Sequence, residues 1–220
     1  FRNALQSIDA PLMAAEFLAK EGHIADAALL IATARVSAKH ASGVARRLLN
    51  LASGHTVEPA VIDTGFVVRE FVNQMRGAVG AGINIALRCN DTWPVVADPN
   101  QLESALLNLC VNSRNAMPRG GWINIEVADV TVNDASAAAI GLVAGEYVQL
   151  VFADSGAGMP EEARRRALEP FFTTRRQDDG TGLGLFMVAT FARSAGGQLR
   201  IASESGQGTT VTLYLPRYTG

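Results

Sequence analysis

The sequence predicts an α+β sandwich, in which helices cover one face of a mixed β-sheet, preceded by an antiparallel helical hairpin. Two observations lead to this expectation. Residues 1–53 carry apolar side chains at helical spacing, whereas from Thr56 onward short apolar strands and helices follow one another. These later elements lack the regular strand–helix–strand alternation of a purely parallel sheet, so a mixed sheet is expected.

Length and composition limit the possible classes of protein. The chain has 220 residues, of which 48% are hydrophobic, enough for one large domain and a small appendage. No apolar run approaches the length of a membrane span, so no membrane contact is expected within the chain. The net charge of −2 argues against a general nucleic-acid binder. Cys89 and Cys110 lie in apolar segments without metal-like spacing, which predicts buried free thiols in a reducing cytoplasm.

The helical hairpin is expected over residues 1–53. Its first helix shows a heptad-like 4-3-4-3-4 spacing, and Pro11 should loosen it. The apolar positions are Phe1, Leu5, Ile8, Leu12, Ala15 and Ala19. A second, alanine-rich helix is expected over 24–51. Because two helices bury little surface, we expect a homodimer through residues 1–53 that forms a four-helix bundle. A hairpin docked on its own chain remains the alternative.

The second domain is expected over residues 54–220. Alternating apolar positions predict strands at 57–62, 83–89, 122–132, 146–153, 198–203 and 209–215. Helices are expected at 66–78, 98–116, 160–168 and 183–194, with a turn of helix inside 133–145. The start of the second of these helices has the strongest signal, because Asp98 can cap it and Pro99 suits its first turn.

A glycine-rich stretch from Val151 to Leu185 indicates a ligand site. An apolar run leads straight to Asp154, which opens a first glycine turn, and a second glycine turn precedes an apolar helix. The glycines are Gly156 and Gly158 in the first turn and Gly180, Gly182 and Gly184 in the second. Glycines let backbone N–H groups approach a ligand, and a helix N-terminus favours anions. An acid beside an anion cradle predicts a nucleotide site.

Three asparagines form a polar stripe on the predicted 98–116 helix. Asn108, Asn112 and Asn115 fall within roughly 60° of one another at helical spacing. Carboxamides beside a core-facing arc are costly unless they are satisfied, and a hydrated Mg²⁺ with phosphate oxygens would satisfy them. Ordinary solvent-facing or capping asparagines are the alternative reading of this helix.

Four motifs together resemble a known family. They are Asn108-Leu-Cys-Val-Asn112-Ser, Asp154-Ser-Gly156-Ala-Gly158-Met159, Glu169-Pro-Phe-Phe-Thr-Thr and Gly180-Thr-Gly182-Leu-Gly184-Leu. In this order they are similar to the N, G1, F and G2 boxes of the ATP-binding domain of sensor histidine kinases. That domain has the GHKL or Bergerat fold, shared with Hsp90-type chaperones, DNA gyrase B and MutL. The resemblance covers about 56–216, is greatest to hybrid-type bacterial kinases, and makes 1–53 similar to the dimerisation and phosphotransfer hairpin.

The resemblance implies roles for individual residues, with ATP and Mg²⁺ as cofactors. Asp154 would accept a hydrogen bond from the adenine amino group, and Asn112 would ligate Mg²⁺. Residues 171–181 would form a lid over the phosphates. The implied ATP site consists of Asn108, Asn112, Asn115, Asp154, Gly156, Gly158, Met159, Phe172, Thr173, Thr174, Arg175, Gly180, Thr181, Gly182, Leu183, Gly184 and Thr210. Arg175 stands where a lysine is common in the family.

The same resemblance favours phosphoryl transfer over hydrolysis. The related ATPases carry a glutamate four residues before the metal-binding asparagine, and here that position is Asn108. Glu103 lies about 140° around the helix from Asn108, so it is a poor substitute. A site without a base beside the γ-phosphate should hydrolyse ATP slowly and wait for an outside nucleophile. A protein histidine kinase is therefore the expected activity, and a GHKL-type ATPase is one alternative.

The phospho-accepting histidine is not found in the sequence. Phe1-Arg-Asn-Ala-Leu-Gln is similar to the residues that follow it in the family, so the acceptor is expected upstream of residue 1. His23, His40 and His55 do not match its position. The expected partner is the receiver domain of a response regulator, which would take the phosphoryl group on an aspartate. A histidine phosphotransferase or pseudokinase adaptor that binds a receiver domain is the other alternative.

Overall fold

The structure is a computed structural model of the chain that describes residues 13, 15–21, 59–76, 79, 82–174 and 182–220. The chain divides into two units, Phe1–Val57 and Glu58–Gly220. In the first unit, residues 13 and 15–20 are helical. The rest of the expected hairpin lies outside the described residues, as do His23, His40 and His55, so the hairpin and the dimer through residues 1–53 stay predictions.

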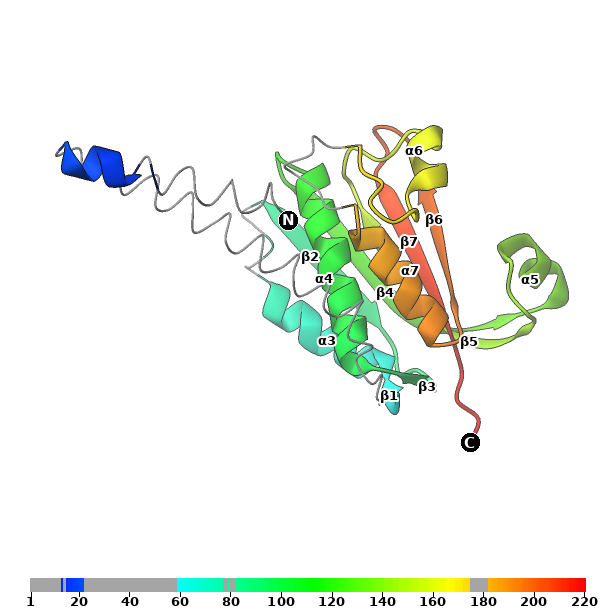
Figure 1. Ribbon diagram of the computed structural model, residues 1–220. Coiled ribbons are helices and arrows are strands. Elements are labelled where there is room, and N and C mark those ends of the chain that lie inside the picture. The colour runs from blue at the N-terminus through cyan, green and yellow to red at the C-terminus, as the bar shows by residue number, and fades with distance from the viewer. Residues whose placement is uncertain (1–12, 14, 22–58, 77–78, 80–81, 175–181) are drawn as a thin grey trace. The chain divides into compact units, whose positions relative to one another are not determined.

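The second unit is built on a five-stranded mixed sheet, as the sequence predicts (Figure 1). The strand order is β2 (Ile83–Cys89), β4 (Gly121–Val132), β5 (Gly145–Asp154), β7 (Thr209–Pro216) and β6 (Gln198–Ser203). β2 and β4 run parallel, and the other neighbouring pairs are antiparallel. A separate two-stranded antiparallel sheet pairs β1 (Ala60–Asp63) with β3 (Pro94–Ala97).

Three helices lie on one face of the five-stranded sheet, which confirms the predicted layers (Figure 1). They are α3 (Thr64–Met75), α4 (Pro99–Ala116) and α7 (Gly184–Ser194), and α4 packs directly on α7. Their apolar sides and the inward residues of the strands share one core. Its largest fully buried side chains include Leu102 and Leu106 of α4 and Phe152 of β5. Two short helices, α5 (Asp134–Ile140) and α6 (Glu161–Arg166), complete the unit.

Helix starts follow the predicted capping. The Asp98 carboxylate accepts hydrogen bonds from the backbone N–H groups of Asn100 and Gln101, with Pro99 in the first turn of α4. Asp63 caps α3 in the same way through Phe66 N, at 3.1 Å. Both caps satisfy N–H groups that a helix otherwise leaves open.

The strand β3 was not predicted from the sequence. It has four residues, begins at Pro94, and pairs with the short β1, apart from one isolated bridge between Val95 and Arg217. Four residues are too few to show a period of two, and a proline normally argues against a strand. A further contact holds this end of the unit, because Tyr218 N donates to Pro94 O at 2.7 Å.

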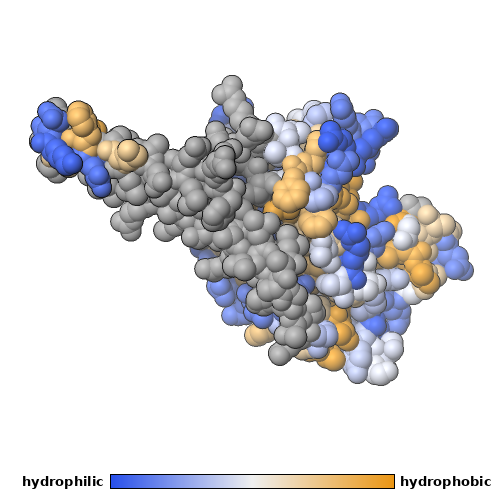
Figure 2. Space-filling model, viewed as in Figure 1, coloured by the Kyte–Doolittle hydropathy of each residue, from blue (hydrophilic) through white to orange (hydrophobic). Residues whose placement is uncertain are grey.

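The helix α6 has a charged surface, with two glutamates followed by three arginines after Ala163. It forms a hydrophilic area at the top of the view in Figure 2. Ion pairs join Glu161 to Arg165 within the helix and Arg166 to Glu169 just after it.

Across the part of the chain that the structure describes, no helix is both long and apolar enough to cross a membrane.

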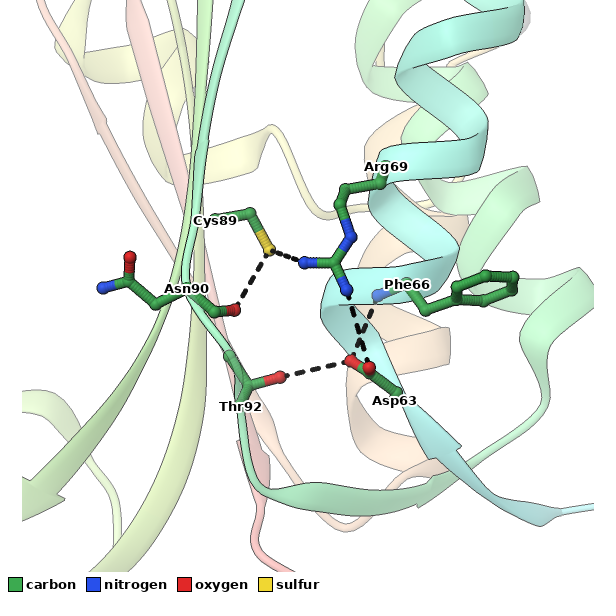
Figure 3. Close-up of polar contacts among 6 residues, drawn as sticks. All are labelled: Asp63, Phe66, Arg69, Cys89, Asn90 and Thr92. Carbon is green, nitrogen blue, oxygen red and sulfur yellow. Dashed lines mark hydrogen bonds and ion pairs between the residues drawn. The ribbon is translucent and has the colours of Figure 1, made fainter.

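Both cysteines are free thiols, as predicted, but the predicted burial is correct only for Cys110, because Cys89 lies at the end of an edge strand and is partly exposed. Cys110 on α4 is 1% exposed, and burial raises its pKa from 9.0 to about 12. Cys89 is half-buried at the end of β2, where Arg69 Nη1 donates to its sulfur at 3.3 Å (Figure 3). Arg69 also pairs with Asp63 at 3.6 Å. Burial raises the pKa of Cys89 too, although the Arg69 charge acts against that rise.

Cys110 should therefore resist alkylation in the folded chain. The thiolate is the reactive form, and a pKa of about 12 keeps this thiol protonated at pH 8. We expect iodoacetamide to modify Cys89 first and Cys110 only after unfolding, as measured by peptide mapping with mass spectrometry. The guanidinium-unfolded chain is the control, in which both thiols should react at similar rates. Equal rates in the native chain would contradict this environment for Cys110.

Candidate functional site

The carboxylate of Asp154 is a buried acidic group at the centre of the site. It ends β5, is 7% exposed, and accepts three hydrogen bonds, from α4, from the start of β7 and from the loop that follows it directly. Its Oδ1 accepts from Gly156 N at 2.8 Å and from Thr209 N at 3.3 Å. Its Oδ2 accepts from Ser113 Oγ at 2.7 Å. Burying a carboxylate is costly unless donors replace water, and these three donors do so.

In the first glycine turn, which follows Asp154, the two glycine positions have no room for a side chain. A Cβ on Gly156 would lie 2.6 Å from Ala116 Cβ, at the end of α4. Gly158 has a φ of +65°, and a Cβ there would overlap the carbonyl oxygen of Glu204. The turn is also tied to α4 directly, since Ala157 N donates to Ala116 O at 3.1 Å. The loop after β5 is therefore held tightly against its neighbours.

The end of β6 and the turn between β6 and β7 also contact the loop after β5. Ser203 Oγ accepts from Met159 N at 2.9 Å and donates to Gly208 O at 2.8 Å. Gly206 N donates to Ala157 O at 2.7 Å. The predicted site residue Met159 thus contributes a backbone N–H that is already bonded within the protein.

The asparagine stripe meets the second glycine turn. A Cβ on Gly184 would lie 3.2 Å from Asn112 Nδ2, so the first turn of α7 lies directly against the Asn112 carboxamide. Asn108 is half-buried, and its Nδ2 donates to Ser104 O in its own helix at 2.9 Å. Asn115 is exposed near the end of α4. Of the three, Asn112 is the one that lies against the helix start.

The start of α7 offers backbone donors. Leu183 at its N-cap position is buried and makes no side-chain cap hydrogen bond. The first N–H groups of a helix have no partners within the helix, and its N-terminus carries a partial positive charge. Together with the oxygen of the Asn112 carboxamide, this helix start suits a phosphate and an oxygen-preferring cation.

The predicted lid begins and ends at one point. Phe171 has a φ of +64°, which is unusual for a residue other than glycine. A Cβ on Gly182 would overlap the Phe171 backbone, so Gly182, which follows the predicted lid, contacts its first residue. Arg166 stacks over the Phe172 ring at 4.3 Å and joins α6 to the lid. Thr173 and Thr174 follow on the lid, whereas Arg175, Gly180 and Thr181 lie outside the described residues.

One site residue needs correction. Thr210 was expected near the adenine end, but it pairs with Ala153 across β5 and β7, whereas Thr209 pairs with Asp154. Residues directly opposite in a sheet share a face, and successive residues alternate. Thr210 therefore lies on the opposite face from Asp154, and Thr209 replaces it.

Three residues of the site were not predicted. Ser113 and Ser203 bond the carboxylate and its loop, and Thr209 supplies a backbone N–H. A signal existed for Ser113, because it is a lone hydroxyl among the buried apolar positions of α4. The other two depend on strand register, which no single segment of sequence specifies.

The sequence matches a known protein family and several characterised kinases. Residues 97–219 match the family described as histidine kinase-, DNA gyrase B-, and HSP90-like ATPase. Over 220 residues the chain is 34% identical to the sensor kinase CckA of Brucella abortus, covering 99% of this chain and 23% of that protein. It is 33% identical over 135 residues to the sensor histidine kinase ZraS of Escherichia coli, covering 61% of this chain and 26% of that protein. The chain thus spans about a quarter of the length of these relatives.

A solved structure shows the same fold. Full-length ShkA, determined in complex with AMPPNP, has a TM-score of 0.68 at 24% identity. The match covers 88% of this chain and 39% of that one.

The tight packing of the first glycine turn predicts unequal effects of two alanine substitutions. Gly158→Ala and Gly206→Ala both place a side chain at positive φ, which costs roughly 1–2 kcal/mol. Only the first also meets an obstacle, because a Cβ on Gly206 has nothing within 4 Å. We expect Gly158→Ala to lower the free energy of unfolding more than Gly206→Ala, as measured by chemical denaturation. Equal losses would show that Glu204 does not confine this turn.

Proposed function

The chain belongs to the family of histidine kinase-, DNA gyrase B- and HSP90-like ATPases, and it has the catalytic core of the sensor histidine kinases. We propose that residues 58–220 bind ATP with Mg²⁺. They serve a protein histidine kinase of a two-component system, which phosphorylates a histidine outside this ATP-binding domain.

The observation that carries the proposal is the buried Asp154 carboxylate. It is fixed by Ser113, Gly156 and Thr209 and lies where the first glycine turn begins. An ionised carboxylate only accepts hydrogen bonds, so it fits a ligand group that only donates. The amino group of adenine is such a group, whereas the keto oxygen of guanine would leave the carboxylate unpaired.

The residues at the start of α7 suit the phosphate end of ATP. Asn112 offers a carboxamide oxygen to Mg²⁺, which keeps several waters and prefers oxygen ligands. The N–H groups in the first turn of α7, after Leu183, suit the phosphates. A bound Mg²⁺ would neutralise charge on the phosphate oxygens.

The chemistry proposed is transfer rather than steady hydrolysis. Activation of water needs a base near the γ-phosphate, and a carboxamide such as that of Asn108 is not one. The Asn108 amide also bonds to Ser104 O in its own helix. In transfer, the bond from the γ-phosphorus to the bridging oxygen breaks and a bond to a histidine nitrogen forms. The domain then needs to position ATP but not to activate water.

The proposed partners follow from this reaction. A homodimer through residues 1–53 would present the acceptor histidine, and a response-regulator receiver domain would take the phosphoryl group on an aspartate. The names of the relatives, sensor kinase and sensor histidine kinase, favour this setting. A cytoplasmic location for this part of the protein belongs to the same proposal.

Replacing the carboxylate should weaken ATP binding with little loss of structure. In Asp154→Asn the carbonyl oxygen can still accept from Gly156 and Thr209, but an amide NH₂ replaces Oδ2 and faces the donor on the base. We expect at least a tenfold weaker affinity for ATP–Mg²⁺, since a buried hydrogen bond to a charged group is lost. Isothermal titration calorimetry of the 220-residue chain measures it.

Asp134→Asn is the matched control, because Asp134 is an exposed aspartate in the first turn of α5. It should bind ATP as the unmodified chain does. Equal affinity of Asp154→Asn and the control would show that the adenine end is misassigned. Rapid, sustained phosphate release by the unmodified chain would contradict the kinase proposal instead and favour the ATPase.

A further inference from the structure

We propose that Ser113 is a positioning residue that makes the base end of the site select purines with an amino group at position 6. The inference rests on the proposed function, since it assumes that the base approaches Asp154. It goes further in assigning a specificity role to a residue on α4, outside the glycine turns. It also distinguishes the two oxygens of the Asp154 carboxylate.

The contact itself is short and buried. Ser113 directly follows Asn112 on α4 and is 2% exposed. Its Oγ donates to Asp154 Oδ2 at 2.7 Å, joining α4 to the end of β5. A hydroxyl that donates to a carboxylate at this distance forms a charge-assisted hydrogen bond, roughly twice as strong as a neutral one. Ser113 therefore restrains the rotation of the carboxylate.

The two carboxylate oxygens have different tasks. Oδ1 receives two backbone N–H groups, those of Gly156 and Thr209, and each carboxylate oxygen has about two acceptor positions. Among the described residues, Oδ2 receives only Ser113. One acceptor position therefore remains on Oδ2, and that oxygen is the one that can meet a donor on the ligand.

The serine hydroxyl adds a second acceptor beside the first. Its single proton is engaged with Oδ2, so its remaining hydrogen-bonding capacity is its oxygen lone pairs. Oδ2 and Ser113 Oγ then form a pair of acceptors 2.7 Å apart. A 6-amino group has two N–H donors to offer such a pair. A 6-keto oxygen is itself an acceptor. Placed beside Oδ2 and Ser113 Oγ it would offer them no N–H donor, so buried polar groups would stay unpaired.

Removal of the hydroxyl should spare the fold. In Ser113→Ala the Asp154 carboxylate keeps its hydrogen bonds to Gly156 and Thr209. Alanine has a higher helix propensity than serine, and the truncation removes one atom from α4. The carboxylate then loses the Ser113 donor on Oδ2, so that oxygen is held less firmly, and the neighbouring acceptor disappears.

Three nucleotides separate a specificity role from a general structural role. ATP carries the 6-amino group, inosine triphosphate carries a 6-keto oxygen, and purine riboside triphosphate carries only hydrogen there. For Ser113→Ala we expect ATP affinity to fall about five- to tenfold, as for the loss of one hydrogen bond. Affinity for purine riboside triphosphate should stay within about twofold, and that for inosine triphosphate should stay or improve. The ATP-to-inosine triphosphate ratio is therefore expected to fall at least about fivefold.

Matched variants complete the experiment. Ser104→Ala makes the same change at an exposed position of α4 and should leave all three affinities unchanged. Ser113→Thr restores a hydroxyl and should recover the ATP preference at least in part. If Ser113→Ala melts below the titration temperature, Ser113→Cys replaces it, because a thiol is only a weak donor.

The possible results differ clearly. An unchanged affinity ratio in Ser113→Ala or Ser113→Cys overturns the inference, and so does an equal loss for all three nucleotides. If the unmodified chain binds none of them, the proposed function fails instead. A lower ratio that Ser113→Thr restores supports the positioning role.

Discussion

The buried carboxylate of Asp154 is the interaction on which the site depends. It brings the end of β5, α4 and the start of β7 to one point through Ser113, Gly156 and Thr209. A carboxylate that is 7% exposed needs such donors, because the cost of leaving its charge unpaired is several kcal/mol. The same contacts give Oδ2 a single donor among the described residues, Ser113, and so leave it an acceptor position for a ligand. Stability and recognition are therefore properties of the same contacts.

Glycines are required where these segments approach one another too closely for a Cβ atom. At Gly158 and Gly208 a Cβ would overlap a carbonyl oxygen, that of Glu204 and that of Asp154. At Gly184 the packing is less severe, yet it brings the first turn of α7 against Asn112. The two glycine turns thus place the adenine end and the phosphate end of the proposed site against neighbouring residues of α4. That helix contributes Ser113 to the first and Asn112 to the second.

Much of this was predictable from local sequence, and the rest depends on long-range packing. Capping at Asp98, the helix over α4 and the long strands follow from residue type and spacing, and the structure confirms them. The choice between Thr209 and Thr210 depends on the register of β7 with β5, which only the assembled sheet sets. The contact of Ser113 with Asp154 also depends on the assembled fold, because the two residues lie 41 positions apart in the sequence. The lid residues from 175 to 181 and the hairpin lie outside the described part of the chain, so their roles remain predictions.

The most direct test of the account is a crystal structure of the chain with AMPPNP and Mg²⁺. The 6-amino group of the base should lie about 3 Å from Asp154 Oδ2. Oδ1 should keep Gly156 and Thr209, and Ser113 should still donate to Oδ2. An amino group bound elsewhere, or a carboxylate turned away from Ser113 to meet it, would contradict the account.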